Sequence, residues 1–422
     1  MYSKTKLANG LSLILAPLKE TKAVTVLILL PVGSRYEHQK INGVSHFIEH
    51  LMFKGTSKRP TSLDLTKELD AVGAEYNAFT AKDHTGYYVK LATENIELAF
   101  DILSDMIFHS VFRSEEIDKE RGVILEEINM YEDNPMIHVQ SIFEQTIYPN
   151  QPLGWQISGP REVIKEISRD DILEYKEKFY QPDNIVLTIA GNFKSKQVIT
   201  LAKKYFGQKS SAKVESLFKP IKINQSKPQI GLMTKETEQV QTCLGVLGYS
   251  LADKKMYPLY LLAVILGGNM SSRLFASVRE EKGLAYYIRT DISAYRDIGT
   301  FLVQSGLDKK RIKEAITLIL AELKKISDFG VTEKELVSAK NYLKGKLVLD
   351  LEDSESVADW FGKQELLLDK ILRPEEKIKK IFAVKKSDVQ AVAKELFKTN
   401  NLNLAMIGPF SEANEFISLL KF

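Results

Sequence analysis

Two histidines and a glutamate form the strongest chemical signal in this sequence. The segment GVSHFIEHLMFKGT, residues 43–56, carries His46, Glu49 and His50 in the order H-x-x-E-H. Residues four apart lie on the same face of a helix, so both imidazoles can reach one metal ion. Glu49 lies beside the second histidine, where its carboxylate can take a proton from a water molecule that the ion activates. This order is the inverted zincin signature, and it predicts one Zn²⁺ per chain.

An accidental pattern is the alternative to a metal site. The chain has six histidines in 422 residues, and an exposed helix could carry two of them without binding a metal. The predicted helix also carries the apolar residues Phe47, Ile48, Leu51 and Met52, which indicates that it is largely buried. Buried imidazole and carboxylate groups need partners, so we favour metal binding.

A catalytic zinc ion needs a third protein ligand and an open position for water. The acidic helix predicted over residues 115–135 offers Glu120 and Glu127, which are seven residues apart and therefore share a face. Glu126 is a competing ligand, because the sequence alone does not settle how this helix is rotated about its axis. A solvated helix face is the ordinary explanation for any one of these glutamates.

Hydrophobic periodicity predicts the elements that would position this site. Apolar segments at 10–17, 24–32 and 185–190 predict strands, and longer periodic segments at 42–54, 62–72, 94–109 and 114–131 predict helices. The polar–apolar alternation of residues 73–91 predicts a hairpin that contains His84 as a hairpin residue and not as a ligand. Grouped strands and helices, without strict βαβ alternation, favour an α+β fold with helices covering one sheet face.

The sequence contains an internal repeat. Residues 185–193, IVLTIAGNF, align with residues 402–410, LNLAMIGPF, at an offset of 217, and in both places an amphipathic helix precedes the buried strand. We therefore predict two homologous α+β domains. The N-terminal zinc-binding domain spans residues 1–206, a polar linker spans 207–229, and the C-terminal domain spans 230–422. At the repeat offset the motif helix falls on residues 263–268, which lack His and Glu, so the second domain is predicted to have no metal site.

Composition restricts the class of protein. The net charge of +3, from 58 basic and 55 acidic residues, is nearly balanced, which argues against a nucleic acid or an anionic membrane surface as partner. Cys243 is the only cysteine, so no intrachain disulfide is expected. The apolar run at 11–18 lacks a cleavage site and predicts a strand, not a signal peptide. No run reaches the ~20 apolar residues of a membrane span, and we expect a cytoplasmic protein.

Taken with their flanking segments, these motifs resemble the pitrilysin/insulinase family of zinc metallopeptidases, especially the two-domain branch near the mitochondrial processing peptidase beta subunit. The resemblance covers nearly the whole chain and includes LANGLSLILAP, VGSRYE, ERGVILEEI and GGNMSSRLFASVREEKGLAYYI. It implies Glu127, and not Glu126, as the third zinc ligand. It implies that Glu120 belongs to the catalytic machinery by orienting a ligand.

The resemblance implies further functional residues outside the metal motif. Arg279 and Tyr286 match a pair that stabilises the oxyanion of the scissile peptide across a closed chamber. Without the resemblance, Arg279 would be interpreted as a surface ion pair and Tyr286 as a core residue. A substrate-binding edge strand, to which an extended peptide adds as a further strand, matches residues Asn77, Ala78, Phe79 and Thr80.

The activity implied by the resemblance is zinc-dependent endopeptidase cleavage of short or unfolded peptides inside a chamber that two chains enclose. The zinc motif and the Arg/Tyr pair lie on one chain, which favours a homodimer over a heterodimer with an inactive homologue. The alternative is a non-catalytic structural or binding subunit, because the family includes respiratory-complex subunits that have lost the metal ligands. The presence of His46, Glu49, His50 and Glu127 argues against that alternative.

Overall fold

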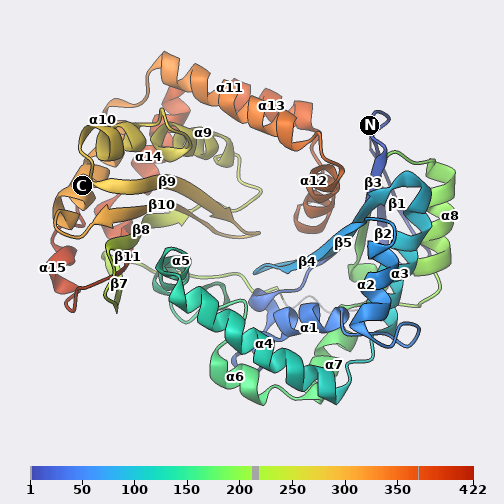
Figure 1. Cartoon of the computed structure of the whole chain (residues 1–422). Coiled ribbons are helices and arrows are strands. Elements are labelled where there is room, and N and C mark those ends of the chain that lie inside the picture. The colour runs from blue at the N-terminus through green and yellow to red at the C-terminus, as the bar shows by residue number, and fades with distance from the viewer. Residues whose placement is uncertain (1, 212–217, 369) are drawn as a thin grey trace. The chain divides into compact units, whose positions relative to one another are not determined.

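The computed structural model describes residues 2–211, 218–368 and 370–422, and its contacts divide the chain into two compact units (Figure 1). Both units are built from three separate segments. Unit 1 comprises Met1–Asn129, Trp155–Phe218 and Val348–Ile371, and unit 2 comprises Met130–Gly154, Lys219–Leu347 and Leu372–Phe422. Part of the predicted linker, residues 212–217, lies outside the described residues, and the predicted domain boundaries stay a prediction.

Unit 1 contains a six-stranded mixed sheet in the order β1-β2-β6-β3-β5-β4. Its strands are β1 (Ser3–Lys6), β2 (Ser12–Pro17), β3 (Ala23–Leu30), β4 (Glu75–Thr80), β5 (Thr85–Ala92) and β6 (Val186–Gly191). β2 and β6 run parallel, and the other neighbouring strands run antiparallel. β4 stands at one end of the sheet, so one side of its backbone has no neighbouring strand in this sheet.

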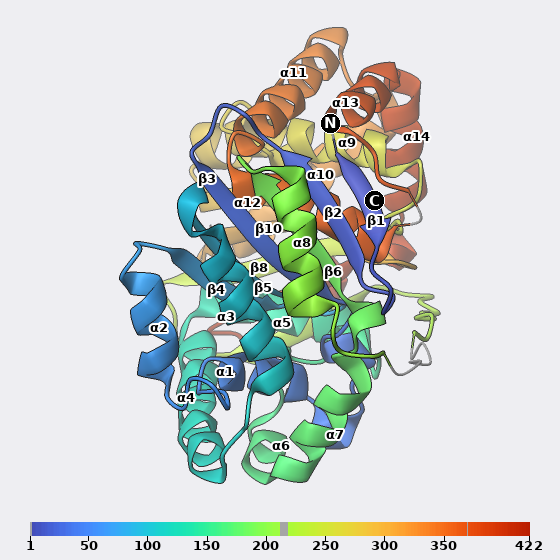
Figure 2. The same cartoon turned by 90° about the vertical axis from the view of Figure 1, so that its right-hand side faces the viewer.

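Helices cover both faces of this sheet. α3 (Ile96–His109) and α8 (Ser195–Phe206) lie on one face, and α12 (Ser354–Leu367) lies on the other (Figure 2). On β3, Val24 and Val26 join the core beside α3, whereas the Thr25 hydroxyl on the opposite face lies 2.8 Å from that of Ser354 in α12. Helices were predicted on one face of the sheet only. β3, AVTVLILL, is apolar on both faces. Its second face is buried by α12, which comes from the second half of the sequence.

Unit 2 contains a five-stranded sheet in the order β7-β11-β8-β10-β9. Its strands are β7 (Gln229–Thr234), β8 (Gln239–Gly248), β9 (Ala285–Ala294), β10 (Gly299–Asp308) and β11 (Asn403–Gly408). On one face lie α9 (Met256–Gly267), α10 (Ile312–Phe329) and α14 (Lys386–Leu396). On the other face lies α5 (Pro135–Ile147), whose Phe143 packs with Cys243 and Ala405.

The predicted duplication is confirmed by the matching elements of the two units. The offset of 217 places α7 (Arg169–Phe179) on α14 and β6 on β11, with the same first and last positions in each pair. Each repeated strand also has one parallel neighbour, β2 beside β6 and β7 beside β11. The chain therefore consists of two copies of one α+β fold, each with a mixed sheet between helices.

The remaining helices connect these layers. They are α1 (Val44–Met52), α2 (Ser62–Asp70), α4 (Ser114–Asp133), α6 (Arg161–Glu166), α11 (Glu333–Asp350), α13 (Pro374–Ala383) and α15 (Asn414–Ile417). The helices predicted at 42–54, 62–72, 94–109 and 114–131 correspond to α1, α2, α3 and α4. The predicted hairpin at 73–91 corresponds to β4 and β5, with His84 in the turn between them.

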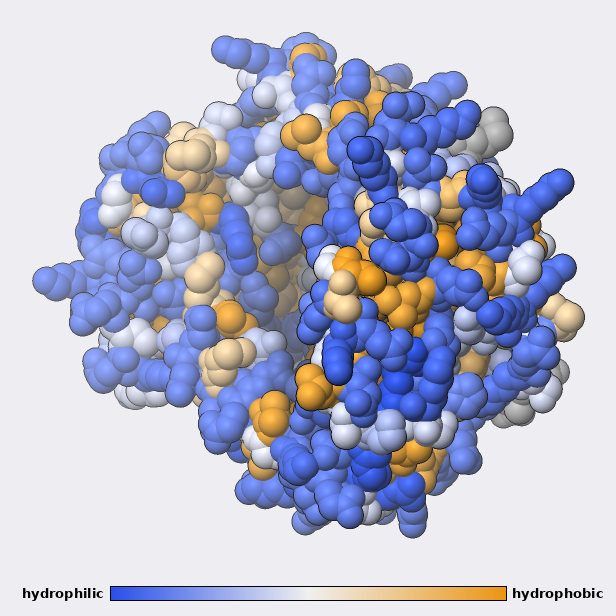
Figure 3. Space-filling model, turned by 45° about the vertical axis from the view of Figure 1, so that its right-hand side comes forward, coloured by the Kyte–Doolittle hydropathy of each residue, from blue (hydrophilic) through white to orange (hydrophobic). Residues whose placement is uncertain are grey.

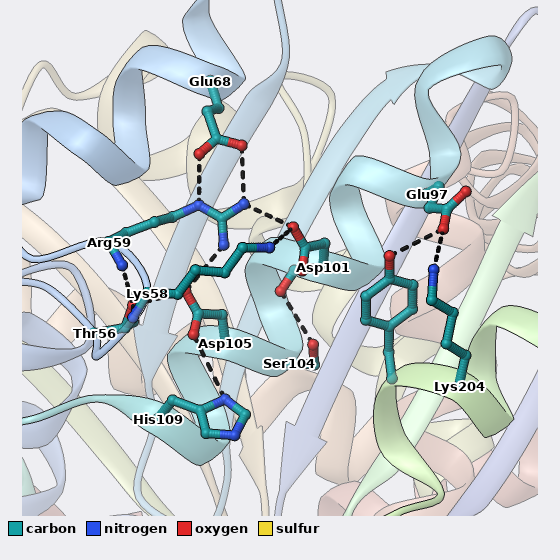
Figure 4. Close-up of polar contacts among 11 residues, drawn as sticks. Thr56, Lys58, Arg59, Glu68, Glu97, Asp101, Ser104, Asp105, His109 and Lys204 are labelled. Atoms are coloured by element: carbon teal, nitrogen blue, oxygen red, sulfur yellow. Dashed lines mark hydrogen bonds and ion pairs between the residues drawn. The ribbon is translucent and has the colours of Figure 1, made fainter.

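A buried arginine attaches the loop after α1 to α3 (Figure 4). The Arg59 guanidinium donates from Nε and Nη2 to the two carboxylate oxygens of Glu68, at 2.7 and 2.8 Å. It also donates to Asp101 at 2.7 Å and to Asp105 at 2.9 Å. The Arg59 side chain is 3% exposed, so three carboxylates compensate one buried cation, and the loop is held at several points.

The surface carries no long apolar stretch on the face drawn in Figure 3, where hydrophilic residues dominate and apolar residues form small groups. Within the described ranges, none of the helices combines the length and the apolar character that crossing a bilayer requires.

Replacing Arg59 by methionine should lower the free energy of unfolding by about 3–5 kcal/mol, because it leaves the buried carboxylate of Asp105 without the Arg59 cation. Urea unfolding followed by circular dichroism measures this change. Lys58→Met is the control, since Lys58 forms a half-exposed ion pair with Asp101 and its loss should cost below about 1 kcal/mol. Equal losses for the two variants would contradict the assigned role of Arg59.

Candidate metal centre

The N-terminus of α1 is held by a buried carboxylate. Oε2 of Glu37 accepts hydrogen bonds from the backbone N–H of Gly43 at 2.7 Å and from Nδ2 of Asn42 at 2.8 Å. Oε1 of Glu37 accepts from the backbone N–H of Ser45 at 2.9 Å. The backbone N–H groups of Gly43 and Ser45 are among those that a helix start leaves without intrahelical partners, and the helix dipole favours a negative charge there. The start of the motif helix is therefore fixed in place.

Gly43 is required at this helix start. Its φ of +103° lies in the left-handed region, and a Cβ at this position would stand 2.7 Å from the carbonyl oxygen of Ser158. The helix that follows buries Phe47, Ile48 and Leu51 completely in the core of unit 1. This burial sets the rotation of α1 about its axis.

The second helix of the site, α4, is rotated by its own apolar residues. Ile117, Ile124 and Ile128 are buried in the same core, and Glu120 and Glu127 lie on the inward side with them. Glu127 is partly buried, whereas Glu126 is exposed. The sequence left open whether Glu126 or Glu127 is the candidate ligand. The packing of α4 places Glu127, and not Glu126, toward the two histidines of α1.

Three ligand atoms converge between α1 and α4. Nε2 of His46 lies 3.3 Å from Nε2 of His50, and Oε2 of Glu127 lies 3.5 Å from the first and 3.4 Å from the second. A tetrahedral zinc ion with bonds of about 2.1 Å places its ligand atoms about 3.4 Å apart. Two imidazoles and one carboxylate at this spacing fit zinc. The side chains of His50 and Glu127 remain 19% and 21% exposed, so the cluster is partly open to solvent, as a zinc site that must also bind water requires.

The far side of the His50 ring is held by a carboxylate and a cation. Nδ1 of His50 lies 3.1 Å from Oε2 of Glu120, and Oε1 of Glu120 lies 2.7 Å from Nζ of Lys54. When Nδ1 carries the proton and donates a hydrogen bond to Glu120, the lone pair of Nε2 is available to a metal. Glu120 was expected from the resemblance to orient a ligand. Lys54 was not expected near the site, and its only signal in the sequence is its position four residues after His50.

The two histidines differ in their affinity for protons as the chain stands in this structure. Burial lowers the pKa of His46 to about 4, with a further contribution from the neighbouring His50. Burial also acts to lower the pKa of His50, but hydrogen bonds to Glu120 and Glu127 outweigh it and raise that pKa to about 9. A metal ligand must be unprotonated, so binding of a metal ion to the second histidine would displace a proton.

Glu49 lies next to the ligands without being one of them. Burial raises its pKa, and a hydrogen bond from the Thr80 hydroxyl to Oε2 of Glu49 opposes that effect. A partly buried carboxylate with a raised pKa is suited to accept and return a proton. Thr80 was expected to bind substrate, and in the structure its side chain contacts Glu49, a contact for which the sequence carries no signal.

The other three residues predicted to bind substrate lie on β4. The backbone of Asn77, Ala78 and Phe79 pairs with β5 on one side, and β4 ends the sheet on the other. The Phe79 ring packs over Gly86, where a Cβ would stand 2.4 Å from the ring. β4 thus presents an edge whose last residue, Thr80, contacts Glu49. His84, in the turn after β4, pairs with Asp83 and is not among the clustered ligands.

Arg279 and Tyr286 belong to unit 2. Arg279 lies in a π-helical turn, Phe275–Glu281, with its guanidinium 4.7 Å from the centre of the Phe275 ring. Tyr286 lies at the start of β9, where the pairing with β10 shifts register, so that it is the additional residue of a β-bulge. Its side chain is 71% exposed, and bulges commonly redirect a side chain toward a function.

Both halves of the chain match models of one protein family. Residues 13–161 match the model described as insulinase, peptidase family M16, and residues 166–343 match the model of the peptidase M16 inactive domain. The name of the second model agrees with the predicted absence of metal ligands from the second half.

Full-length relatives are similar along almost the whole chain. The "uncharacterized zinc protease YmxG" of Bacillus subtilis is 37% identical over 410 residues, covering 97% of this chain and 98% of that protein. An "uncharacterized zinc protease" of Rickettsia felis is 32% identical over 412 residues, covering 97% of this chain and 98% of that protein.

Solved structures show the same fold. A protease from Helicobacter pylori superimposes with a TM-score of 0.91 at 25% identity, covering 97% of this chain and 99% of that one. A chain of complex III2 from Candida albicans reaches a TM-score of 0.85 at 18% identity, covering 100% of both chains, which shows the shared fold alone. By its two family matches and its full-length relatives, the chain belongs to the insulinase family of peptidases, peptidase family M16.

Proposed function

We propose that this chain is a zinc-dependent endopeptidase that hydrolyses short or unfolded peptides inside a closed chamber. The observation that carries the proposal is the tetrahedral spacing of His46, His50 and Glu127 beside the partly buried carboxylate of Glu49. The names of the relatives as zinc proteases support it. A non-catalytic subunit would need neither a complete ligand set nor a general base next to it.

Each residue of unit 1 has a distinct task in this proposal. A bound zinc ion supplies Lewis acidity, which polarises a peptide carbonyl and lowers the pKa of water. Glu49 takes the proton from the attacking water and then delivers it to the departing amine nitrogen. Thr80 holds the Glu49 carboxylate by its hydrogen bond, and Glu120 holds the His50 ring.

The substrate is proposed to bind as an extended strand along the free edge of β4. Backbone N–H and C=O groups of Asn77 to Phe79 would pair with the peptide, as edge strands do in β-augmentation. The end of β4 at Thr80 then brings the peptide to Glu49. Main-chain pairing selects extended, unfolded peptides and leaves the side-chain preference open.

Arg279 and Tyr286 are proposed to donate hydrogen bonds to the oxyanion that forms on the scissile carbonyl. A guanidinium and a phenol are suitable donors, and the exposed Tyr286 hydroxyl at the bulge of β9 is available to a ligand. Donors of this kind act because negative charge develops on the carbonyl oxygen only in the transition state.

Replacing Glu49 by glutamine should lower kcat by a factor of about 10²–10⁴, the usual contribution of a general base, while zinc still binds. Hydrolysis of a quenched fluorescent peptide library and the zinc content of the same samples measure the two effects. Glu127→Gln should lower zinc affinity, and Glu126→Gln should change neither activity nor zinc binding. A wild-type chain that binds no zinc and cuts no peptide would refute the proposed function.

Replacing Tyr286 by phenylalanine, or Arg279 by methionine, should lower kcat by about 10²–10³, as loss of one oxyanion donor does, with zinc content unchanged. Steady-state kinetics on one cleaved peptide separates kcat from KM. Tyr287→Phe is a matched control on the same strand, because its hydroxyl donates to Gln241. If the Tyr286 and Tyr287 variants behave alike, the oxyanion role is wrong.

We also propose that two copies of the chain enclose the chamber. One chain carries both the metal ligands and the Arg/Tyr pair, so a homodimer needs no second gene product. Light scattering of the purified chain should give twice the mass of one chain, with activity in that species. Activity that appears only after an inactive homologue is added would favour a heterodimer instead.

A further inference from the structure

The loop that follows α1 places a cation behind the metal site. α1 ends at Met52, and Lys54 extends its Nζ to within 2.7 Å of Oε1 of Glu120. The other oxygen of the same carboxylate, Oε2, lies 3.1 Å from Nδ1 of His50. One carboxylate therefore contacts an ammonium group through one oxygen and a candidate zinc ligand through the other.

The burial of Glu120 makes its carboxylate depend on the charged groups around it. The Glu120 side chain is 6% exposed and the Lys54 side chain 27%, so the carboxylate is removed from water and depends on charged partners. A buried carboxylate without such a partner is strongly unfavourable. Among the described residues, Glu120 is the only carboxylate that forms an ion pair with Lys54.

We propose that Lys54 is a positioning residue of the zinc site. Its ammonium group holds the Glu120 carboxylate in the orientation in which Oε2 accepts the Nδ1–H of His50. The ring then presents Nε2 to the metal, because the two ring nitrogens lie on opposite sides of the imidazole. This inference rests on the proposed zinc peptidase function and adds a residue that acts through Glu120.

The backbone at this position is held independently of the side chain. The N–H of Lys54 donates to the carbonyl of Leu51 at 3.0 Å, and its carbonyl accepts from Nη2 of Arg113 at 3.0 Å. Replacing the side chain therefore removes the ammonium group while the loop stays attached. An effect of the replacement on zinc binding can then be assigned to the ion pair.

The test measures zinc affinity by competition with a chromophoric chelator, and zinc release after excess chelator is added. Lys54→Met should weaken zinc binding on the order of tenfold, the lower end of the loss seen when groups that support a metal ligand are removed. Lys54→Arg should restore most of the affinity, because it keeps the cation. Lys58→Met should bind zinc as the wild type does, since its ion pair is with Asp101.

A double-mutant comparison assigns the effect to Glu120. In a Glu120→Gln background, Lys54→Met should cause no further loss, because the carboxylate it holds is absent. An equal loss in both backgrounds would overturn the proposal, as would a Lys54→Met chain that binds zinc like the wild type. Thermal unfolding of the metal-free variants checks their folding. If neither Lys54→Met nor Lys54→Gln folds, Lys54 is a structural requirement and the proposal is wrong.

The same experiment distinguishes this inference from the proposed function. A wild-type chain that binds no zinc refutes both. A wild-type chain that binds zinc tightly, with an unchanged Lys54→Met variant, refutes only the role of Lys54.

Discussion

The site depends on the burial of two amphipathic helices in one hydrophobic core. α1 buries Phe47, Ile48 and Leu51, and α4 buries Ile117, Ile124 and Ile128. Once these apolar residues are packed, the rotation of each helix about its axis is set, and the polar residues on the inner sides of the two helices face one another. Apolar packing therefore brings His46, His50 and Glu127 together, and polar contacts such as that of His50 with Glu120 act on the side chains within this arrangement. The close packing of protein interiors provides the needed rigidity.

Two glutamates near these residues, Glu120 buried and Glu49 partly buried, illustrate how environment separates the pKa values of carboxylates. Burial acts to raise the pKa of Glu120, but hydrogen bonds from His50 and Lys54 outweigh it, and the pKa is lowered. Glu49 has a hydroxyl partner, Thr80, in place of a lysine, and burial raises its pKa. The lowered pKa favours the charged form of the first carboxylate, which contacts the His50 ring, whereas the raised pKa of the second suits it to the proposed proton exchange. Such divergence between neighbouring carboxylates is a common basis for acid–base chemistry.

Duplication explains the rest of the architecture. Each unit repeats the helix–strand pair α7–β6 or α14–β11, and each covers the second face of its sheet with a helix from the other half of the sequence. α12 packs on the first sheet and α5 on the second. Each unit thus depends on both halves of the chain, since each sheet is apolar on both faces. The two copies differ in sequence where the first has its metal motif, because residues 263–268 at the repeat offset lack His and Glu. The second copy has a β-bulge at Tyr286.

Local patterns were sufficient for the elements and for the metal motif. Hydrophobic period predicted α1 to α4 and the strands β2, β3 and β6, and the four-residue spacing of His46 and His50 predicted their common face. These features depend on residues close in sequence, where helix and strand geometry alone relate position to direction. The repeat offset was visible for the same reason, since it compares two local patterns.

Contacts between distant segments were decided only by tertiary structure. The packing of α4 in the core distinguishes Glu127 from Glu126. From the sequence, only the resemblance to a family indicated Glu127. The hydrogen bond from Thr80 to Glu49 and the ion pair from Lys54 to Glu120 join residues 31 and 66 positions apart. α12 covers a sheet whose nearest strand in sequence, β6, ends more than 150 residues earlier. Periodicity predicts the face of a helix or strand on which a side chain lies. Which distant residue that side chain contacts depends on how whole helices and strands pack together. That packing follows from the burial of the entire core.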